Sequence, residues 1–281
     1  MTTNILYYGN CQLYAIKTLL NLQSVNESLI ECFDCELDKW NEEEFKKKVL
    51  LQDIIITQPI KDDYRNVHYL STNYIINNCK HDCKIIIVDS CHFDFYYFDL
   101  TYKFWNEKLL REPDDYHYYG MMECFKKKES IDYYLDNYVN NVDLKSKEDL
   151  ENLAYRSIEE LERRYNENCV KYKTTENIFI LTSSEYIRNN FKEKLLFYSM
   201  NHPTKYVIQN ICEQIIFILN RNNTIRYDVD VLNHYKSILY KSVQKVVNFD
   251  LNDHKPHVNN NITAKDIAQL YYETYQNIGF N

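Results

Sequence analysis

Glycine is the scarcest backbone-shaping residue in this sequence: its 281 residues include only three, Gly9, Gly120 and Gly279. Glycines this far apart form neither the G-x-G-x-x-G turn of dinucleotide-binding proteins nor a Walker A phosphate loop. They also exclude the G-x-S-x-G nucleophile elbow of α/β-hydrolases. Any nucleotide or acyl chemistry in this protein must therefore use another kind of turn.

Basic charge is scarce relative to acidic charge. The chain has 33 lysines and arginines against 41 aspartates and glutamates, a formal net charge of −8. Proteins that bind the phosphate backbone of nucleic acids usually present a basic face. We therefore expect no nucleic-acid partner. No apolar stretch approaches the roughly 18 residues that a membrane-spanning helix needs, so we expect no membrane span either.

The nine cysteines point to a reducing compartment, because the N-terminus Met1-Thr2-Thr3-Asn4 lacks the basic region and apolar run of a secretion signal. We expect a cytoplasmic protein. The 27 tyrosines and the abundant Asn, Lys and Ile are typical of an AT-rich genome, as in some large DNA viruses. If the gene is viral, the compartment is the host cytoplasm.

The first third of the chain shows four short apolar runs, each of which predicts a strand: Ile5 to Tyr8, Leu29 to Phe33, Ile54 to Thr57, and Ile85 to Val88. The third and fourth are continuous β-branched runs, the pattern of strands covered on both faces in a parallel sheet. Helical spacing follows the first strand and precedes the third. The fold class is therefore predicted as α/β with a parallel sheet.

Beyond Asp99 the pattern changes to helices, which predicts two portions, an α/β portion over residues 1–99 and a mainly helical portion over 100–281. Ser146 resembles a cap before a long amphipathic helix with the stripe Leu150, Ala154, Ile158, Leu161 and Tyr165. A second long helix is predicted to start at Pro203, since proline suits the first helical position. A last helix is predicted from Ala264 to about Tyr275.

The clearest candidate for chemistry is Tyr8-Gly9-Asn10-Cys11-Gln12, which follows the first strand and opens the first helix. A thiol at a helix N-terminus faces unpaired N–H groups and the positive end of the helix dipole, which stabilise the thiolate. Gly9 would supply the tight turn, and Cys11 would be the nucleophile. The alternative is a buried, inert Cys11, a common fate of free cysteines.

Two further candidates end or begin predicted elements. Gln58 follows the third strand, so it should emerge at the same sheet edge as Cys11 and donate its amide N–H to a developing oxyanion. His202 precedes the helix predicted at Pro203 and would act as a general base. The plain alternatives are a turn glutamine and a surface histidine.

Several weaker signals are held in reserve. His254 and His257 form either a second acid/base pair or part of a polar loop. Cys32-x-x-Cys35 and the Cys79 to Cys83 segment have ligand-like spacing, but the distance between the pairs matches no common zinc module, so no metal is expected. Phosphate contacts from the long helix are a further option, although a solvated face explains its arginines more simply: Arg156, Arg163 and Arg164.

Taken together, these motifs resemble the WcbI-type polysaccharide-biosynthesis acetyltransferases, a coenzyme A-dependent family with a G-N-C-Q turn near the N-terminus. The resemblance covers about residues 4 to 220 and rests on four segments in order: Gly9 to Gln12, Gln58-Pro59, Phe93 to Tyr97, and Phe197 to Thr204. It implies an SGNH- or Rossmann-like parallel layer that presents the nucleophile. Cys11 replaces the usual serine, Gln58 an oxyanion-hole asparagine, and Ser199 an orienting aspartate, which leaves the third triad member unidentified.

The resemblance implies transfer of acetyl from acetyl-CoA to a hydroxyl or amine of a sugar, nucleotide-sugar or glycan. Cys11 would accept the acyl group or line the thioester, His202 would be the base, and Gln58 with the turn formed by Gly9, Asn10 and Gln12 would stabilise the oxyanion. Two alternatives stay open: an SGNH-type carbohydrate esterase that removes acetyl groups, and a non-catalytic partner in glycan assembly. The coenzyme A-binding residues, the acceptor and the oligomeric state are not identified by the sequence.

Overall fold

The computed structural model describes residues 2–31, 40–220, 224–234, 237–254 and 262–280. These residues form two compact units that interleave along the chain. The first unit comprises Met1–Cys91, Ile158–Arg188 and Pro203–Leu232, and the second comprises His92–Ser157, Asn189–His202 and Asn233–Asn281. The predicted division into residues 1–99 and 100–281 differs from this one, because later segments return to the first unit.

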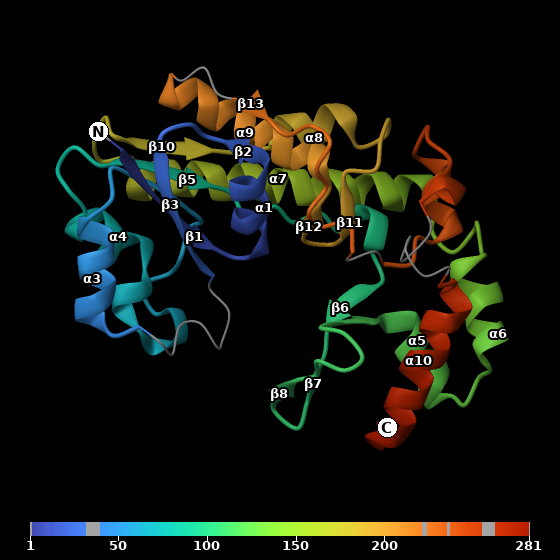
Figure 1. Ribbon diagram of the computed structural model, residues 1–281. Coiled ribbons are helices and arrows are strands. Elements are labelled where there is room, and N and C mark those ends of the chain that lie inside the picture. The colour runs from blue at the N-terminus through green and yellow to red at the C-terminus, as the bar shows by residue number, and fades with distance from the viewer. Residues whose placement is uncertain (1, 32–39, 221–223, 235–236, 255–261, 281) are drawn as a thin grey trace. The chain divides into compact units, whose positions relative to one another are not determined.

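The first unit is built on a five-stranded parallel sheet (Figure 1), which confirms the predicted fold class. In sheet order its strands are β10 (Ile178–Leu181), β5 (Lys84–Val88), β4 (Ile54–Thr57), β1 (Thr3–Gly9) and β3 (Val25–Glu31). Four of these overlap the predicted strands. β3 begins at Val25 rather than at Leu29 as predicted, and residues 32 and 33 of that prediction lie outside the described residues. A two-stranded antiparallel ribbon, β2 (Leu20–Asn21) with β13 (Thr224–Ile225), belongs to the same unit.

Both faces of this sheet are covered, as the continuous β-branched runs predict. Leu6, Ile55 and Ile85 pack on one face in a core with Phe45. Phe45 belongs to α3 (Glu42–Leu50), which lies with α4 (Thr72–Asn78) on the opposite side of the sheet from α9 (Lys205–Leu219) (Figure 1). The short helices η1 (Tyr64–Asn66) and η2 (His68–Leu70) lead into α4.

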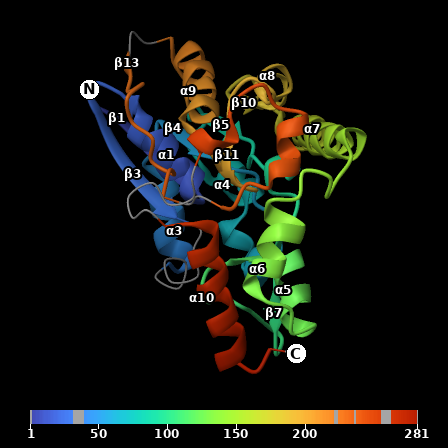
Figure 2. The ribbon, with the colours of Figure 1, turned by 90° about the vertical axis from the view of Figure 1, so that its right-hand side faces the viewer.

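Helix α9 lies beside α1 (Cys11–Leu19) (Figure 2). Cys212 Sγ lies 3.8 Å from the Ile16 carbonyl oxygen. The prediction that this long helix starts at Pro203 was wrong. Thr204 is the N-cap, and His202–Pro203 forms the short strand β12, which pairs with β11 (Phe197–Ser199). Backbone pairing thus holds His202 in an extended segment before the helix.

Strand β10 lies beside β5 at one edge of the sheet, and the sequence analysis did not predict it. Its four-residue apolar run follows α7 (Lys147–Tyr172), whose strong helical pattern dominates this part of the sequence. The long helix itself was predicted correctly, and Ser146 Oγ accepts from the N–H of Asp149 as expected for a cap. Helix α8 (Ser184–Asn190) follows β10.

The second unit is mainly helical and has an aromatic core that includes Tyr118, Tyr134, Tyr240 and Tyr275. The predicted last helix is α10 (Ala264–Asn277), and Thr263 and Asp266 form a capping box at its N-terminus. The other elements of this unit are β6 (Leu100–Tyr102), β7 (Phe104–Trp105), β8 (Lys108–Leu109), β9 (Tyr116–Tyr118), α5 (Tyr119–Lys126), α6 (Ile131–Tyr134) and the short helices η3 (Phe95–Tyr97), η4 (Leu135–Val139), η5 (Lys241–Lys245) and η6 (Leu251–Asp253). In the described ranges, no helix combines the length and the apolar character that crossing a membrane requires.

Candidate functional site

The motif around Cys11 lies where the sequence predicted it, at the turn from β1 into α1. Asn10 is the N-cap of α1, and its Oδ1 accepts from the backbone N–H of Gln12 at 2.9 Å. Cys11 is the first residue of the helix and is half-buried. This turn follows the carboxyl end of β1 in a parallel sheet, and α/β proteins commonly bind their ligands beside the carboxyl ends of such strands.

Gly9 is required here by close approach rather than by an unusual backbone angle. A Cβ atom at this position would lie 2.6 Å from Gln58 Oε1 and 2.8 Å from Leu13 Cδ2. Gln58 Oε1 in turn accepts from the N–H of Asn10 at 2.9 Å. The structure therefore brings Gln58 to the Cys11 turn. Because Gly9 has no side chain, the side-chain amide of Gln58 can approach and support that turn.

Gln12 is buried and ties the turn to the segment after β5. Its Nε2 donates to the carbonyl oxygen of Cys91 at 2.9 Å, while its Oε1 accepts from the N–H of Cys91 at 3.0 Å. Gln58 Nε2 lies 3.5 Å from the same Oε1. The side chains of Gln12 and Gln58 thus connect the ends of β1, β4 and β5. Gln58 supports the turn through its oxygen, and its nitrogen points at Gln12.

The N–H groups at the start of α1 favour the Cys11 thiolate, but they are not the dominant influence on its pKa. Burial, together with the nearby Glu31 carboxylate, raises the pKa of the Cys11 thiol to about 12. The N–H groups of Cys11 and Gln12 lower this pKa, but by less. Desolvation thus outweighs the helix dipole. This shift favours the protonated thiol at neutral pH.

His202 is buried in the second unit and stays neutral at physiological pH. Burial, together with the nearby His234, lowers the pKa of its imidazole to about 3. Its Nδ1 lies 2.7 Å from Ser199 Oγ and 3.3 Å from the Tyr116 hydroxyl. A neutral imidazole has the lone pair that a general base requires.

Ser199 and Tyr116 are the partners of His202 that sequence reasoning did not assign. Both hydroxyls donate to Oδ1 of Asn201, and Asn201 Nδ2 donates to the Tyr102 hydroxyl at 3.0 Å. The position of Ser199, three residues before His202, was the available signal. No sequence pattern indicated Tyr116, since it reaches His202 from a strand distant in the chain.

Cys11 belongs to the first unit and His202 to the second. The structure shows how each is held by its own neighbours: the turn amides for the thiol, and the hydroxyl cluster for the imidazole. Their joint action stays a prediction.

Of the three arginines singled out on α7, Arg164 reaches the sheet edge. Its Nη1 donates to the carbonyl oxygen of Ser90 at 3.3 Å, while Asn10 Nδ2 lies 3.4 Å from Ser90 Oγ. Arg164 Nε is buried without a hydrogen bond in the described part of the chain, 3.6 Å from a Glu160 oxygen. The other two follow the simpler expectation: Arg156 is exposed, and Arg163 pairs with acidic residues of its own helix.

Asp89, at the end of β5, is a buried acid that the sequence analysis did not single out. Burial raises the pKa of its carboxyl to about 6, and the Arg164 guanidinium opposes this rise. Thr182 Oγ1 donates to its Oδ2 at 3.0 Å. The sheet edge that carries Cys11 therefore also carries the Arg164 cation and the buried acid Asp89.

The reserve candidates are not part of either cluster. His254 packs edge-on against Phe249 with ring centroids 5.2 Å apart, and His257 lies outside the described residues. The Cys79 and Cys83 thiols donate to the carbonyl oxygens of Ile76 and Lys84 at 3.5 and 3.9 Å. Cys32 and Cys35 also lie outside the described residues. Over the ranges that the structure describes, no group of three or more His, Cys, Asp or Glu side chains is arranged to hold a metal ion.

These observations define an α/β protein with a cysteine presented at a strand-to-helix turn and a buried neutral histidine. Residues 4–223 match the family described as polysaccharide biosynthesis enzyme WcbI. The chain therefore belongs to the WcbI family of polysaccharide biosynthesis enzymes. Among curated proteins, no relative matches it.

A solved WcbI structure has the same fold, with a TM-score of 0.78 and 18% sequence identity over 99% of this chain and 91% of that chain. It is described as a novel polysaccharide biosynthesis enzyme, in its native form without a disulfide bond between coenzyme A and one of its cysteines. At this identity the likeness establishes the fold.

Proposed function

We propose that this protein is a coenzyme A-dependent acyltransferase that moves acetyl from acetyl-CoA to a hydroxyl or amine of a sugar, nucleotide-sugar or glycan. The observation that carries the proposal is Cys11 at a turn that Gln12 and Gln58 brace, in a family of polysaccharide biosynthesis enzymes. The description of the related structure names coenzyme A together with a cysteine, which supports coenzyme A as the co-substrate.

In the covalent route, Cys11 Sγ attacks the thioester carbonyl carbon, and the bond from that carbon to the coenzyme A sulfur breaks. His202 accepts the thiol proton and returns it to the departing sulfur. The acceptor oxygen or nitrogen then attacks the acetyl carbonyl carbon, and the bond from that carbon to Cys11 Sγ breaks. His202 takes the proton of the acceptor and passes it to Sγ, which regenerates the thiol. The raised pKa of Cys11 supports the need for such a base.

The hydroxyl cluster gives His202 the tautomer that this role requires. When Ser199 and Tyr116 donate to Asn201 Oδ1, their oxygens face Nδ1 as acceptors. Nδ1 then carries the hydrogen, and the lone pair stands on Nε2. In this proposal Ser199 takes the orienting place that an aspartate holds in SGNH-type proteins.

The residues at the Cys11 edge fit a phosphorylated thioester substrate. Arg164 supplies a cation beside Ser90, and its buried Nε lacks a hydrogen-bond acceptor in the described ranges. Arginine is well suited to phosphate groups. The N–H groups near Cys11 are the proposed donors to the oxyanion, together with the Gln58 Nε2 hydrogen that is not directed at Gln12.

The first test is binding of coenzyme A, read as a rise in thermal stability because a ligand of the native state stabilises it by mass action. Acetyl-CoA without acceptor is then added, and the intact protein is weighed, with Cys11→Ser as the matched control. An acetyl adduct that the control lacks supports the covalent route. Normal turnover without an adduct refutes that route and favours direct deprotonation of the acceptor.

Two outcomes would refute the acyltransferase itself. Hydrolysis of an aryl acetate without coenzyme A, and no transfer with it, would indicate a carbohydrate esterase. Absence of both coenzyme A binding and turnover would indicate a non-catalytic partner in glycan assembly.

A further inference from the structure

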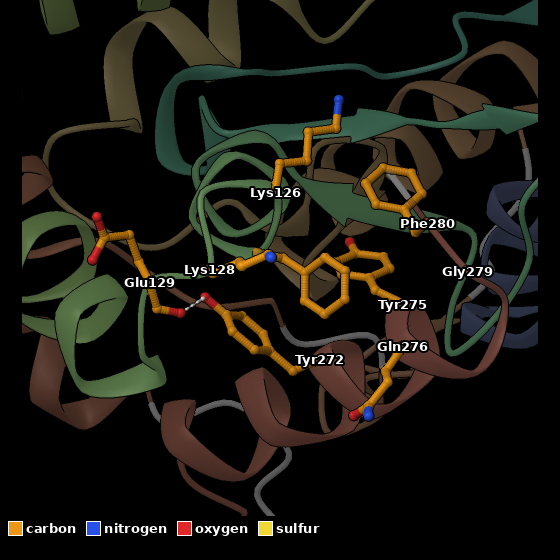
Figure 3. A pocket seen from close by; sticks show the side chains of 9 residues that line it. Lys126, Lys128, Glu129, Tyr272, Tyr275, Gln276, Gly279 and Phe280 are labelled. Atoms are coloured by element: carbon orange, nitrogen blue, oxygen red, sulfur yellow. Dashed lines mark hydrogen bonds between the residues drawn. The ribbon is translucent and has the colours of Figure 1, made fainter.

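The second unit contains an open hollow of about 520 Å³ where α5 and α10 end (Figure 3). This volume is within the range of small-molecule sites. The lining residues combine aromatic rings with charged and amide groups: Phe125, Lys126, Lys128, Glu129, Tyr272, Tyr275, Gln276, Gly279 and Phe280. All of them belong to the second unit, whereas Cys11 belongs to the first.

The rings form one connected cluster. Tyr275 stacks on Phe280 with centroids 4.7 Å apart, and Phe125 meets the Tyr272 ring edge-on at 5.3 Å. The Tyr272 hydroxyl donates to the Glu129 carbonyl oxygen at 3.3 Å, which fixes the ring at the rim. Aromatic faces carry partial negative charge and attract the partially positive C–H groups on the face of a sugar ring.

Three lysines converge on the same cluster from two segments. Lys126 Nζ lies 5.4 Å and Lys103 Nζ 5.6 Å from the centroid of the Phe280 ring. Lys128 extends towards the rings in Figure 3, whereas Glu129 points away from them. Cations also favour a helix C-terminus, and α5 ends at Lys126. That effect does not account for Lys103, which comes from the segment between β6 and β7.

The lysines of this cluster differ in their pairing from two other lysines of the same unit. Lys245 and Lys265 each pair with an aspartate at 2.7 Å. Within the described residues, Lys103, Lys126 and Lys128 form no ion pair. In a chain of net charge −8, unpaired lysines around aromatic rings indicate an anionic ligand.

We propose that this hollow binds a sugar ring that carries an acidic group, with the ring packed on the aromatic cluster and its carboxylate or phosphate held by the lysines. The proposal rests on the proposed function in one respect: polysaccharide chemistry is the reason for choosing a sugar as the ring. The hollow would then recognise an acidic acceptor or an acidic unit of the growing glycan.

The experiment measures binding by calorimetry with four probes: glucuronic acid, glucose 6-phosphate, methyl glucoside and inorganic phosphate. At least one acidic sugar should bind about tenfold more tightly than both methyl glucoside and phosphate, which is about 1.4 kcal/mol. The two acidic sugars distinguish a carboxylate from a phosphate ligand. The proposal is overturned if neither acidic sugar binds more tightly than both methyl glucoside and inorganic phosphate.

Variants locate the binding. The double change Lys126→Gln with Lys128→Gln should weaken binding about tenfold, whereas the exposed neighbour change Lys127→Gln should alter it less than about twofold. Tyr272→Leu should weaken binding about fivefold, and Tyr272→Phe, which keeps the ring, should leave it nearly unchanged. An equal loss in the control variants would place the ligand elsewhere and overturn the proposal.

Coenzyme A binding is measured in parallel on the same proteins. If the wild-type protein binds coenzyme A but neither acidic sugar, the hollow is refuted as a sugar site and the acyltransferase proposal stands. Sugar binding without any coenzyme A binding would refute the acyltransferase and leave the hollow as a sugar site.

Discussion

The low pKa of His202 predicts a specific loss of stability in mild acid. Its imidazole is neutral when folded, since burial lowers its pKa from 6.5 to about 3. In the unfolded chain the same group takes up a proton near pH 6.5. Its contribution to stability is therefore fully present above pH 6.5 and is lost as the pH falls towards 3.

The magnitude follows from the distance between the two pKa values. Each pH unit below 6.5 costs about 1.36 kcal/mol while the folded imidazole stays neutral. At pH 5 the loss is about 2 kcal/mol, and any folded pKa of 4 or below gives nearly the same value. Asp99 acts in the opposite direction: burial raises its pKa to about 6, so its contribution is present below pH 3.8 and lost as the pH rises through 6.

The perturbation is His202→Asn, which keeps a nitrogen donor for Ser199 but does not titrate. Urea unfolding of both proteins at pH 7 and pH 5 gives the difference in their unfolding free energies. Because Asp99 and the other acids act alike in both proteins, they cancel. The advantage of the wild type over the variant should shrink by about 2 kcal/mol between pH 7 and pH 5. A change below about 0.5 kcal/mol would show that His202 is not shielded from water and protons, and would refute the reasoning.

Two further predictions concern the Cys11 turn. Gly9→Ala should destabilise the protein by about 1–3 kcal/mol, because the new methyl would lie 2.6 Å from Gln58 Oε1 and break its bond to Asn10; an unfolding free energy equal to wild type contradicts this. At pH 8, iodoacetamide should alkylate Cys79 well before Cys11. The neighbouring Cys83 thiol lowers the pKa of Cys79 to about 7, whereas burial raises the pKa of Cys11 to about 12. Peptide mass spectrometry over time measures both rates, and faster labelling of Cys11 would contradict the burial argument.

Local pattern was sufficient to predict most of the elements that form the sheet. Runs such as Ile54 to Thr57 cannot be amphipathic, so their burial on both faces and their parallel pairing follow from composition alone. β10 escaped prediction because a four-residue apolar run has little periodicity, and only its pairing with β5 makes it a strand. The start of α9 was misplaced because proline suits the first helical turn, yet here Pro203 belongs to a paired strand.

The site shows the same division. The motif around Cys11 and the position of His202 were visible in the sequence because strand-to-helix turns and the residues before helices have local signatures. The raised pKa of Cys11 was not visible in the sequence. The sequence predicts a helix dipole that lowers this pKa, but it does not show the desolvation that raises it by more.

The sequence alone determined which residues stand at the chemistry-bearing positions and that a parallel α/β layer presents them. Only the tertiary structure decided that Gly9 makes room for Gln58 and that the Gln12 side chain hydrogen-bonds to the backbone of Cys91. It also decided that the Ser199 and Tyr116 hydroxyls contact the His202 imidazole. The physical reason is range: propensity and periodicity act within a few residues, whereas hydrogen bonds and burial join segments tens of residues apart.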